Sequence, residues 1–403
     1  MASTPAPDMP YMHLVESTGE VKFSSPEVDY PLYIKALGNL TVKFGNTYEY
    51  SKDNVTWKSA TSSTSISATK GEMVFFRASG LTASSSSGIG SFTISNGDCN
   101  VGGNIMSMVY GSDFKGKTEI TQTYQFYQLF GGALKIVNAG GLALPATTLA
   151  DYCYQYMFNG CKSLINAPAL PATTLARNCY NYMFQNCTSL VNAPALPATT
   201  LAQYCYSYMF NSCTSLVTAP VLPATTLADY CYQYMFNGCK SLVNVPALPA
   251  TTLVSNCYNY MFQNCTSLVN APALLATTFG TACCQYMFSG CTSLVNAPAL
   301  LATTLASNCC QYMFNGCTSL VNAPALPATK LVSNCYNYMF KGCTSLNYIK
   351  AMFKTTPITS YLNNWVSGVS PTGTFVKNSA ATWADTFGVS AIPEGWTVEL
   401  ADA

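Results

Sequence analysis

Cysteine recurs in this chain with a fixed spacing that extends over about half of its length. One series of eight cysteines, spaced every 26 residues, runs from Cys153 to Cys335. A second series with the same spacing runs from Cys161 to Cys343. Eight copies of one unit without insertion or deletion predict a solenoid, because such units bury a continuous core only by stacking on their neighbours. A solenoid presents a long regular surface and no single enclosed pocket, so we expect a role in binding or display.

Charge is scarce in this chain. Charged residues make up 9% of the 403 residues, hydrophobic residues make up 49%, and the formal net charge is +1. Seven charged residues lie between Ala143 and Leu346. A nucleic-acid-binding protein needs a basic stripe that neutralises phosphates, so nucleic acid is not an expected partner. Pro, Thr and Asn interrupt every repeat before the ~18 apolar residues that a membrane span requires, so no span is expected.

The N-terminal residues 1–26 are rich in proline and contain the only histidine, His13. We interpret them as a flexible arm, or one that a partner orders. They lack the basic start and apolar core of a secretory signal, which indicates synthesis in a cytoplasm. A reducing cytoplasm argues against a disulfide framework. Assembly into a virus particle released by lysis would reconcile cytoplasmic synthesis with an outward-facing repeat protein.

Residues 27–123 contain short β-prone runs separated by turn residues, at 32–34, 40–44, 48–51, 73–77, 90–95 and 104–110. Residues 52–54 predict a hairpin between Tyr50 and Trp57. Residues 82–90 are rich in Ser and Gly and predict an exposed loop. The size and pattern of the region favour a β-sandwich, which we interpret as an attachment domain.

The repeat region has atypical ends, as solenoids require. Residues 124–143 form a degenerate first repeat, in which Phe130 aligns with Phe158 and Ala133 replaces the second cysteine. The predicted solenoid therefore spans residues 124–346, a degenerate cap plus eight repeats. Residues 347–403 predict a small C-terminal cap that contains three of the four tryptophans, with strands at 374–377 and 396–399.

Residues 172–197 illustrate one repeat. Cys179, Met183 and Cys187 stand at i, i+4 and i+8, which predicts a helix with one apolar stripe. Thr173 or Thr174 would cap this helix, and Asn186 would end it in the left-handed conformation, as Gly160 would in the first unit. Residues 189–193 predict a short extended segment that pairs with its counterpart in the next coil. The predicted core consists of Cys153, Met157, Phe158, Cys161, Leu164, Cys179, Met183, Phe184, Cys187 and Leu190.

The run from Tyr156 to Leu164 resembles the Ala-Phe-x-x-Cys-x-x-Leu core of BspA-like leucine-rich repeats, found in surface proteins of gut and oral bacteria and in mobile elements. Phe158, Cys161 and Leu164 keep the family spacing, and every copy repeats it. The period is long for the family but within the leucine-rich range of roughly 20–29 residues. The flanking segments are similar to those of gut Bacteroidetes and phage proteins. The β-prone runs, the 26-residue period and this resemblance together predict an α+β fold, in which a leucine-rich-repeat solenoid with 26-residue units follows the β-sandwich.

The cysteines and carboxylates do not predict a catalytic or metal site. The C-x7-C spacing fits no zinc motif, and no histidine lies near it, so core packing is favoured. Cys284 and Cys310 replace a tyrosine in adjacent coils, and a disulfide between them stays open as an alternative. Asp151 and Asp229 lie three coils apart, too far for a glycosidase pair. We expect no enzymatic activity and no cofactor.

Variable polar positions around the first cysteine of each unit form the candidate ligand surface. Tyrosine and amide side chains provide contact area and hydrogen bonds without charge, which suits a neutral glycan or a protein receptor. The alternative is that they are merely solvated repeat surface. The candidates are Tyr152, Gln155, Asn178, Asn181, Tyr204, Ser207, Tyr230, Gln233, Asn256, Asn259, Gln285, Gln311 and Asn337.

These features together predict a non-enzymatic adhesion or receptor-binding protein. The favoured location is a bacteriophage virion, as a fibre or capsid decoration that binds a host-surface glycan or protein. The N-terminal region would attach the protein to its scaffold, and a homotrimer is one form this assembly could take. One alternative is a bacterial cell-surface BspA-like adhesin, and another is a structural spacer without a specific ligand. Residues 151–164 and 229–242 are identical, which indicates that three-unit blocks were copied and that length or avidity matters.

Overall fold

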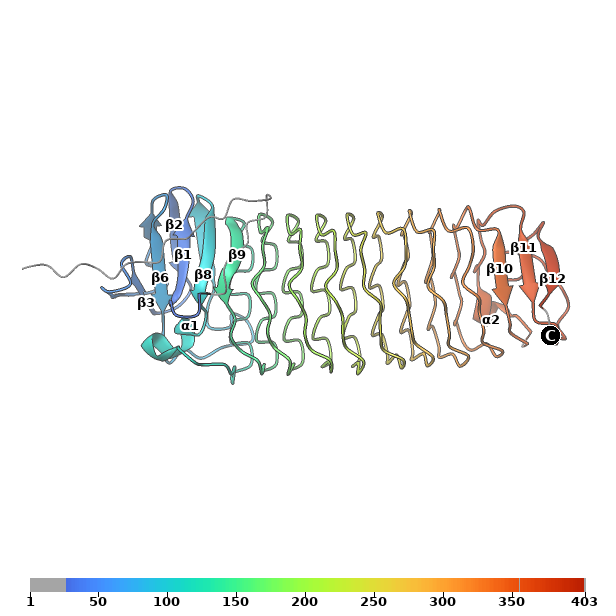
Figure 1. Cartoon of the computed structure of the whole chain (residues 1–403), viewed down its shortest axis with the longest axis horizontal. Coiled ribbons are helices and arrows are strands. Elements are labelled where there is room, and N and C mark those ends of the chain that lie inside the picture. Colours follow the sequence, from blue (N-terminus) through green and yellow to red (C-terminus); the bar gives the residue numbers. More distant parts are fainter. Residues whose placement is uncertain (1–26, 355, 402–403) are drawn as a thin grey trace, which may run out of the picture.

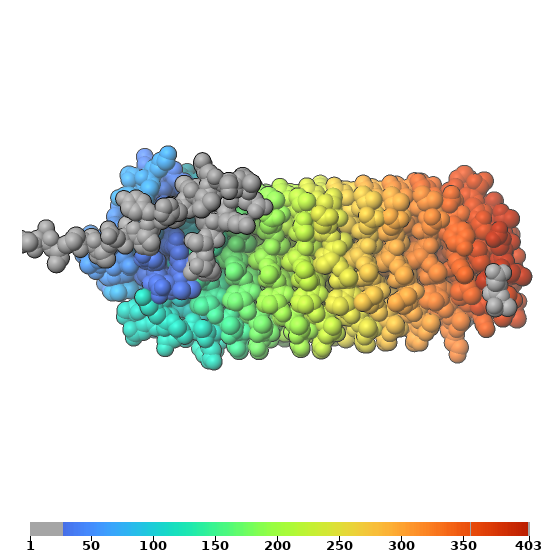
Figure 2. Space-filling view, viewed as in Figure 1, coloured from blue at the N-terminus to red at the C-terminus, as the bar shows by residue number. Residues whose placement is uncertain are grey.

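The computed structural model describes residues 27–354 and 356–401. These residues form a rod, with two β-sheets at one end, a row of similar coils in the middle and a third sheet at the other end (Figure 1). The space-filling view shows the coils packed against one another without a break (Figure 2). The predicted N-terminal arm, including His13, lies outside the described residues.

Two sheets build the N-terminal end of the rod. The six-stranded sheet has the order β4-β3-β6-β1-β8-β9, and the three-stranded sheet has the order β5-β2-β7. Their strands are β1 (Leu32–Ala36), β2 (Leu40–Phe44), β3 (Tyr48–Ser51), β4 (Lys58–Ala60), β5 (Ile66–Ala68), β6 (Met73–Arg77), β7 (Phe92–Asn96), β8 (Cys99–Asn104) and β9 (Ile136–Ala143). The predicted hairpin is confirmed, because β3 pairs antiparallel with β4. The predicted strand over 104–110 is wrong beyond Asn104, where α1 (Ser107–Tyr110) and a short 3₁₀ turn, η1 (Gly111–Asp113), follow.

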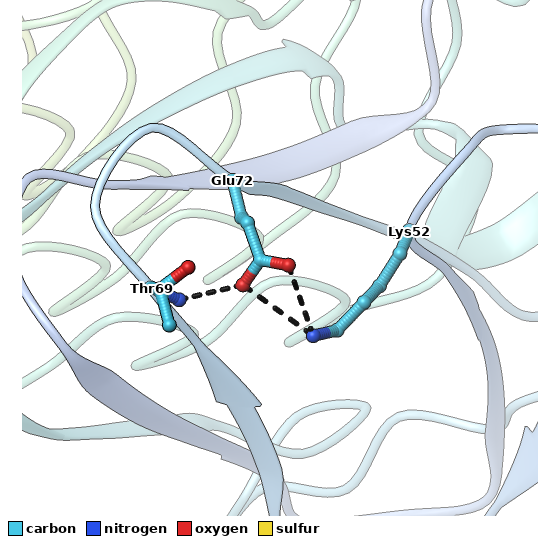
Figure 3. A network of polar contacts seen from close by, with 3 residues as sticks. All are labelled: Lys52, Thr69 and Glu72. Carbon is cyan, nitrogen blue, oxygen red and sulfur yellow. Dashed lines mark hydrogen bonds and ion pairs between the residues drawn. The ribbon is translucent and has the colours of Figure 1, made fainter.

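The loop between β5 and β6 carries the chain from the smaller sheet to the larger one. Its turn is closed by Glu72, whose carboxylate accepts a hydrogen bond from the Thr69 N–H at 2.6 Å and lies 3.4 Å from the Lys52 ammonium (Figure 3). The Thr69 hydrogen bond, followed by the charge of Lys52, lowers the pKa of this carboxyl group. This network closes the turn at the crossover between the two sheets.

The N-terminal sheets and the coils share one core. Phe92 of β7 stacks on Phe130 of the first, degenerate repeat with ring centroids 5.3 Å apart, and Phe130 stacks on Phe158 of the next coil at the same distance. Strand β9 pairs in parallel with β8, and on its other side the Ala139 N–H donates to the Asn166 carbonyl at 2.9 Å. The solenoid therefore continues the six-stranded sheet.

Successive coils pair through single parallel bridges in the segment that was expected to be extended. Asn166 bridges to Asn192, and Asn192 bridges to Thr218. The predicted pairing of residues 189–193 with the next coil is thus confirmed. Thr174 forms a further bridge, to Thr148, and caps no helix.

The helix predicted over residues 179–187 is wrong. Within the described residues, the helical elements are α1, η1 and α2 (Thr359–Leu362), and all three lie outside the eight repeats. The segment instead forms a chain of tight turns, because Asn178, Tyr182 and Asn186 have positive φ angles of 55°, 59° and 61°. An α-helix cannot contain such residues at every fourth position. The left-handed conformation expected for Asn186 and Gly160 is nevertheless present.

The C-terminal end is a parallel sheet of β10 (Tyr348–Ala351), β11 (Thr374–Lys377) and β12 (Thr397–Leu400). Trp365 is fully buried against Phe340 of the last repeat, with ring centroids 6.0 Å apart. The Trp365 indole N–H donates to the Ala391 carbonyl at 2.7 Å. The ring therefore covers the end of the core without leaving its polar N–H group unpaired.

Candidate ligand-binding face

The turn segment of each coil, such as residues 177–187, has backbone hydrogen bonds of two alternating kinds. One N–H donates to the following coil, as Tyr180 does to the Cys205 carbonyl at 3.1 Å. The N–H groups that alternate with these close turns within their own coil. For example, the Met183 N–H donates to the Tyr180 carbonyl at 3.1 Å. Each coil is therefore hydrogen-bonded both internally and to its neighbour. Equivalent side chains of successive coils consequently lie in register.

Tyrosines at one of the positive-φ positions form a continuous column along the rod. Neighbouring rings stack with centroids 4.2 to 4.6 Å apart and with 2° to 12° between their planes. These side chains are half-buried, so their ring faces cover one another while solvent reaches their edges. We call this set the tyrosine column; it consists of Tyr156, Tyr182, Tyr208, Tyr234, Tyr260, Tyr286, Tyr312 and Tyr338.

Both ends of the tyrosine column are covered. Tyr127 of the degenerate repeat meets Tyr156 edge to face at 5.7 Å, with 77° between the ring planes. At the other end the Lys341 ammonium lies 5.5 Å from the centre of the Tyr338 ring. Asn363 donates to the Tyr338 hydroxyl at 2.8 Å. No ring of the column therefore offers a bare face.

An amide ladder runs beside the tyrosine column at the position that precedes each tyrosine. Gln155 donates to the Asn181 side-chain oxygen at 2.7 Å, and Asn181 donates to the Ser207 carbonyl at 2.9 Å. Gln233 donates to Asn259 at 3.1 Å, so the pattern continues farther along the rod.

A second amide ladder lies three residues after each tyrosine. Asn159 donates to Gln185 at 2.8 Å, Gln185 to Asn211 at 3.0 Å and Asn211 to Asn237 at 2.9 Å. Each such bond uses one of the two donors of an amide group, which leaves the second N–H for other partners where the side chain reaches solvent.

The structure divides the sequence-predicted ligand residues into two groups. The buried ones, which the structure removes from an exposed ligand surface, are Asn178, Asn181, Ser207, Asn259 and Asn337. The side chains of Asn181 and Asn259 are buried where they hydrogen-bond to neighbouring coils, whereas the buried Ser207 hydroxyl has no hydrogen-bond partner among the described residues. The half-buried ones are Tyr152, Gln155, Tyr204, Tyr230, Gln233, Asn256, Gln285 and Gln311. Within that group Tyr204 and Tyr230 stack at 4.6 Å.

The tyrosine column itself was missed by the sequence reasoning. Tyr182 and its equivalents are not among the candidate ligand residues that the sequence indicates. The available signal was an invariant tyrosine directly before Met-Phe in all eight copies.

The column is uncharged at neutral pH. Burial raises the pKa of Tyr156 and of Tyr182 to about 12, and the neighbouring phenol groups add to the effect. The few nearby carboxylates are engaged by the backbone, as Asp151 accepts a hydrogen bond from the Arg177 N–H at 2.9 Å. Apart from Lys341 at its C-terminal end, the face therefore presents uncharged hydroxyl and amide groups.

The cysteines lie inside the solenoid. All 19 are free thiols and buried, including Cys284 and Cys310, so the structure contains no disulfide between these two. The second series donates to carbonyl groups of the preceding coil, as Cys187 does to Phe158 at 3.1 Å. Within residues 27–354 and 356–401, His, Cys, Asp and Glu side chains form no group of three or more that could hold a metal ion. No helix in the described part of the chain has the length and apolar character to cross a bilayer.

A separate exposed stripe lies on the strand segment of each coil. One β-branched apolar side chain in each of the first seven repeats is 37% to 43% exposed there. The stripe consists of Ile165, Val191, Val217, Val243, Val269, Val295 and Val321. It provides positions for control substitutions away from the tyrosine column.

A repeat solenoid with in-register columns of solvent-accessible side chains is a binding scaffold. The family model of the BspA type leucine rich repeat region, in six copies, matches residues 148–269, 208–323 and 278–364, which together cover more than half of the chain. The chain therefore belongs to the BspA-type leucine-rich repeat family. A search of the curated proteins and a search of the solved structures each found no match.

Proposed function

We propose that this protein is a surface-displayed, non-enzymatic adhesion protein that binds a host-surface glycan or protein through the tyrosine column. Membership of the BspA-type family supports surface adhesion or protein interaction as the class of function. The proposal goes further, because it assigns the binding to one face of the solenoid.

The conformation of the tyrosines is the observation that carries the proposal. All eight have φ angles between 54° and 59°, a region where Gly and Asn are favoured and bulky residues are uncommon. Gly160 and Asn186 occupy the equivalent conformation four residues later. Backbone geometry alone would therefore favour Gly or Asn throughout. Stacking of the aromatic rings offsets this backbone cost but does not require the phenol hydroxyl groups, which supports a role for these groups in binding.

The arrangement of the rod supports separate functions for its N-terminal sheets, its coils and its C-terminal sheet. The coils extend away from the N-terminal sheets (Figure 1). We propose residues 27–123 as a β-sandwich attachment domain, residues 124–346 as the ligand-binding solenoid and residues 347–403 as its cap. The proposed scaffold is a bacteriophage virion, with a bacterial cell surface as the alternative, and assembly as a trimer is part of the same proposal.

Binding of the full chain to intact gut bacteria tests this function. The variant Y208N/Y234N/Y260N removes three phenols but keeps a residue that tolerates the left-handed conformation. The control V191T/V217T/V243T alters the exposed stripe on the strand segment. We expect the tyrosine variant to lose cell binding and the control to retain it. Equal binding by both variants would exclude the tyrosine column, and no binding by the full chain would favour a structural spacer. Immunogold labelling of virions and of cells distinguishes the two surfaces.

A further inference from the structure

We infer that the tyrosine column and its two amide ladders bind a linear, uncharged polysaccharide that lies along the axis of the solenoid. This inference rests on the proposed adhesion function and names the ligand class for the same face.

The first argument is the regularity of the face. Bridged strands of neighbouring coils are spaced about 4.7–4.9 Å apart. Each coil adds one phenol group, and half-buried amides such as those of Gln155, Gln185 and Gln233 flank the column. The segments 151–164 and 229–242 are identical, so coils three units apart repeat the same flanking side chains. A ligand with the same group at each step along its own axis can use every coil. A linear polysaccharide has this property, whereas the surface of a folded protein rarely repeats one group in a straight row.

The second argument is the absence of charge. The phenol groups of Tyr156 and Tyr182 are protonated at neutral pH, and the flanking ladders consist mainly of amides such as Gln155 and Gln185. A charged polymer would need opposite charges along the face to replace its counterions. The repeats have seven charged residues between Ala143 and Leu346, which are too few to line a continuous track.

The third argument concerns the orientation of the aromatic rings. Tyr234 stacks on Tyr208 at 4.4 Å and on Tyr260 at 4.2 Å, so both of its faces are covered. A sugar ring therefore cannot stack on an interior tyrosine. What remains accessible is the edge of each ring together with the unused amide donors, which are partners for the hydroxyl groups of a sugar chain.

The expected binding is a sum of weak contacts. Each coil contributes a few hydrogen bonds in competition with water, so the net gain from each bond is small. Short oligosaccharides should therefore bind weakly, and long chains should gain affinity from many coils at once.

Direct binding measurements with the full chain test the inference. The probes are linear neutral polysaccharides, namely β-glucan, mannan, xylan and galactan, each as disaccharide and as long chain, with alginate as a charged control. We expect at least one neutral long chain to bind about tenfold or more tighter than its disaccharide, which corresponds to about 1.4 kcal/mol, with little dependence on salt. Alginate should not bind.

Two variants make the test specific to the face. Y208F/Y234F/Y260F removes three hydroxyl groups and keeps the ring stack, so we expect about a tenfold loss of polysaccharide affinity, while the V191T/V217T/V243T control is unchanged. Deleting residues 151–228 joins Ala150 to Asp229 and removes three coils, yet the new junction has the same sequence as the old one. This shortened chain should lose affinity for long chains and retain its weak affinity for disaccharides.

Failure of the inference can be told apart from failure of the adhesion function. If no neutral polysaccharide binds but bacteria are still bound, and protease treatment of the bacteria abolishes that binding, the ligand is a protein and the inference is overturned. Unchanged polysaccharide affinity in the phenylalanine variant also overturns it. If neither bacteria nor polysaccharides bind the full chain, the adhesion function itself fails.

Discussion

Tyr234 and Tyr260 stack face to face across neighbouring coils, with ring centroids 4.2 Å apart and 8° between the ring planes. Both residues have left-handed backbones, with φ angles of 54° and 57°. Such a backbone costs roughly 1–2 kcal/mol for a residue with a side chain. An aromatic pair contributes about 0.5–1.5 kcal/mol beyond its buried area, and an interior ring has two such neighbours. Stacking between coils thus offsets the cost of the backbone.

Substitutions at Tyr234 should separate the energetic cost of the left-handed backbone from the stabilisation by ring stacking. Tyr234→Phe keeps the ring, and we expect its free energy of unfolding to stay within about 0.5 kcal/mol of the wild type. Tyr234→Val loses the stack and places a β-branched residue at positive φ, so a loss of roughly 2 kcal/mol or more is expected. Urea unfolding followed by circular dichroism measures both variants. A valine variant as stable as the phenylalanine variant would contradict the stacking argument.

Asn186 tests the left-handed position at the end of the turn segment. Its φ angle is 61°, and Gly160 and Gly238 occupy the equivalent position in other coils at 73°. Asn186→Gly should therefore leave the free energy of unfolding nearly unchanged. Asn186→Ala should lower it by roughly 1 kcal/mol, because the Ala Cβ clashes in the left-handed conformation and Ala lacks the polar group by which Asn can form local hydrogen bonds. Equal thermal unfolding of the two variants would show that the backbone is not under this constraint.

Phe236 tests the core. It is fully buried and stacks on Phe210 and on Phe262, each at 5.6 Å. Phe236→Ser should cost about 3–5 kcal/mol, since it removes a large buried ring and leaves a hydroxyl in its place. Met235→Ser, also fully buried, should likewise unfold the solenoid locally. The matched control in the same coil is Val243→Ser, where the side chain is 42% exposed and the change should be small. Hydrogen exchange resolved along the chain would show whether protection is lost around the substituted coil, and unchanged protection would refute the assignment of Phe236 to the core.

The thiols should make the protein sensitive to alkali. Burial raises the pKa of Cys161 and of Cys291 to about 12, from an ordinary value of 9. The folded chain therefore holds these protons more tightly than the unfolded chain. The resulting stability is fully present below pH 9 and is lost progressively as the pH rises toward 12. Urea midpoints across this range measure the loss, and Cys161→Ala should reduce its steepness. Native protein at neutral pH should also resist alkylation at all 19 cysteines, and rapid labelling would contradict their burial.

The core of the repeats could be predicted from the sequence, but the path of the backbone could not. Cys179, Met183 and Cys187 are buried, and they follow a spacing of four that resembles the period of a helix. The same spacing arises from successive turns with a left-handed residue at every fourth position. Asn178 and Asn186 were compatible with such turns, but the bulky Tyr182 between them was not a recognisable turn residue.

The candidate surface was predicted only in part, for a related physical reason. A helix over residues 179–187 would place Asn181 and Tyr182 differently from a chain of turns. In the turns Asn181 is buried in a ladder between coils, while Tyr182 is half-buried in the column. The sequence therefore indicated amide and tyrosine side chains as candidates, but the wrong local structure could not show which of them are buried and which are accessible.

The contact between Phe92 and Phe130 leads to a last prediction, on cooperativity. Phe92 of β7 is 2% exposed and packs on Phe76 at 5.0 Å as well as on Phe130 at 5.3 Å. It thus belongs to the N-terminal sheets and to the stack of phenylalanines in the solenoid. Phe92→Ala should cost about 3–5 kcal/mol and lower the stability of both parts together. The control Phe387→Ala, at a side chain that is 51% exposed near the other end, should have little effect. Calorimetry, together with hydrogen exchange in β2 and in residues 124–143, measures the coupling. If only β2 lost protection, the N-terminal sheets would unfold independently of the coils, and the shared core would not be a cooperative unit.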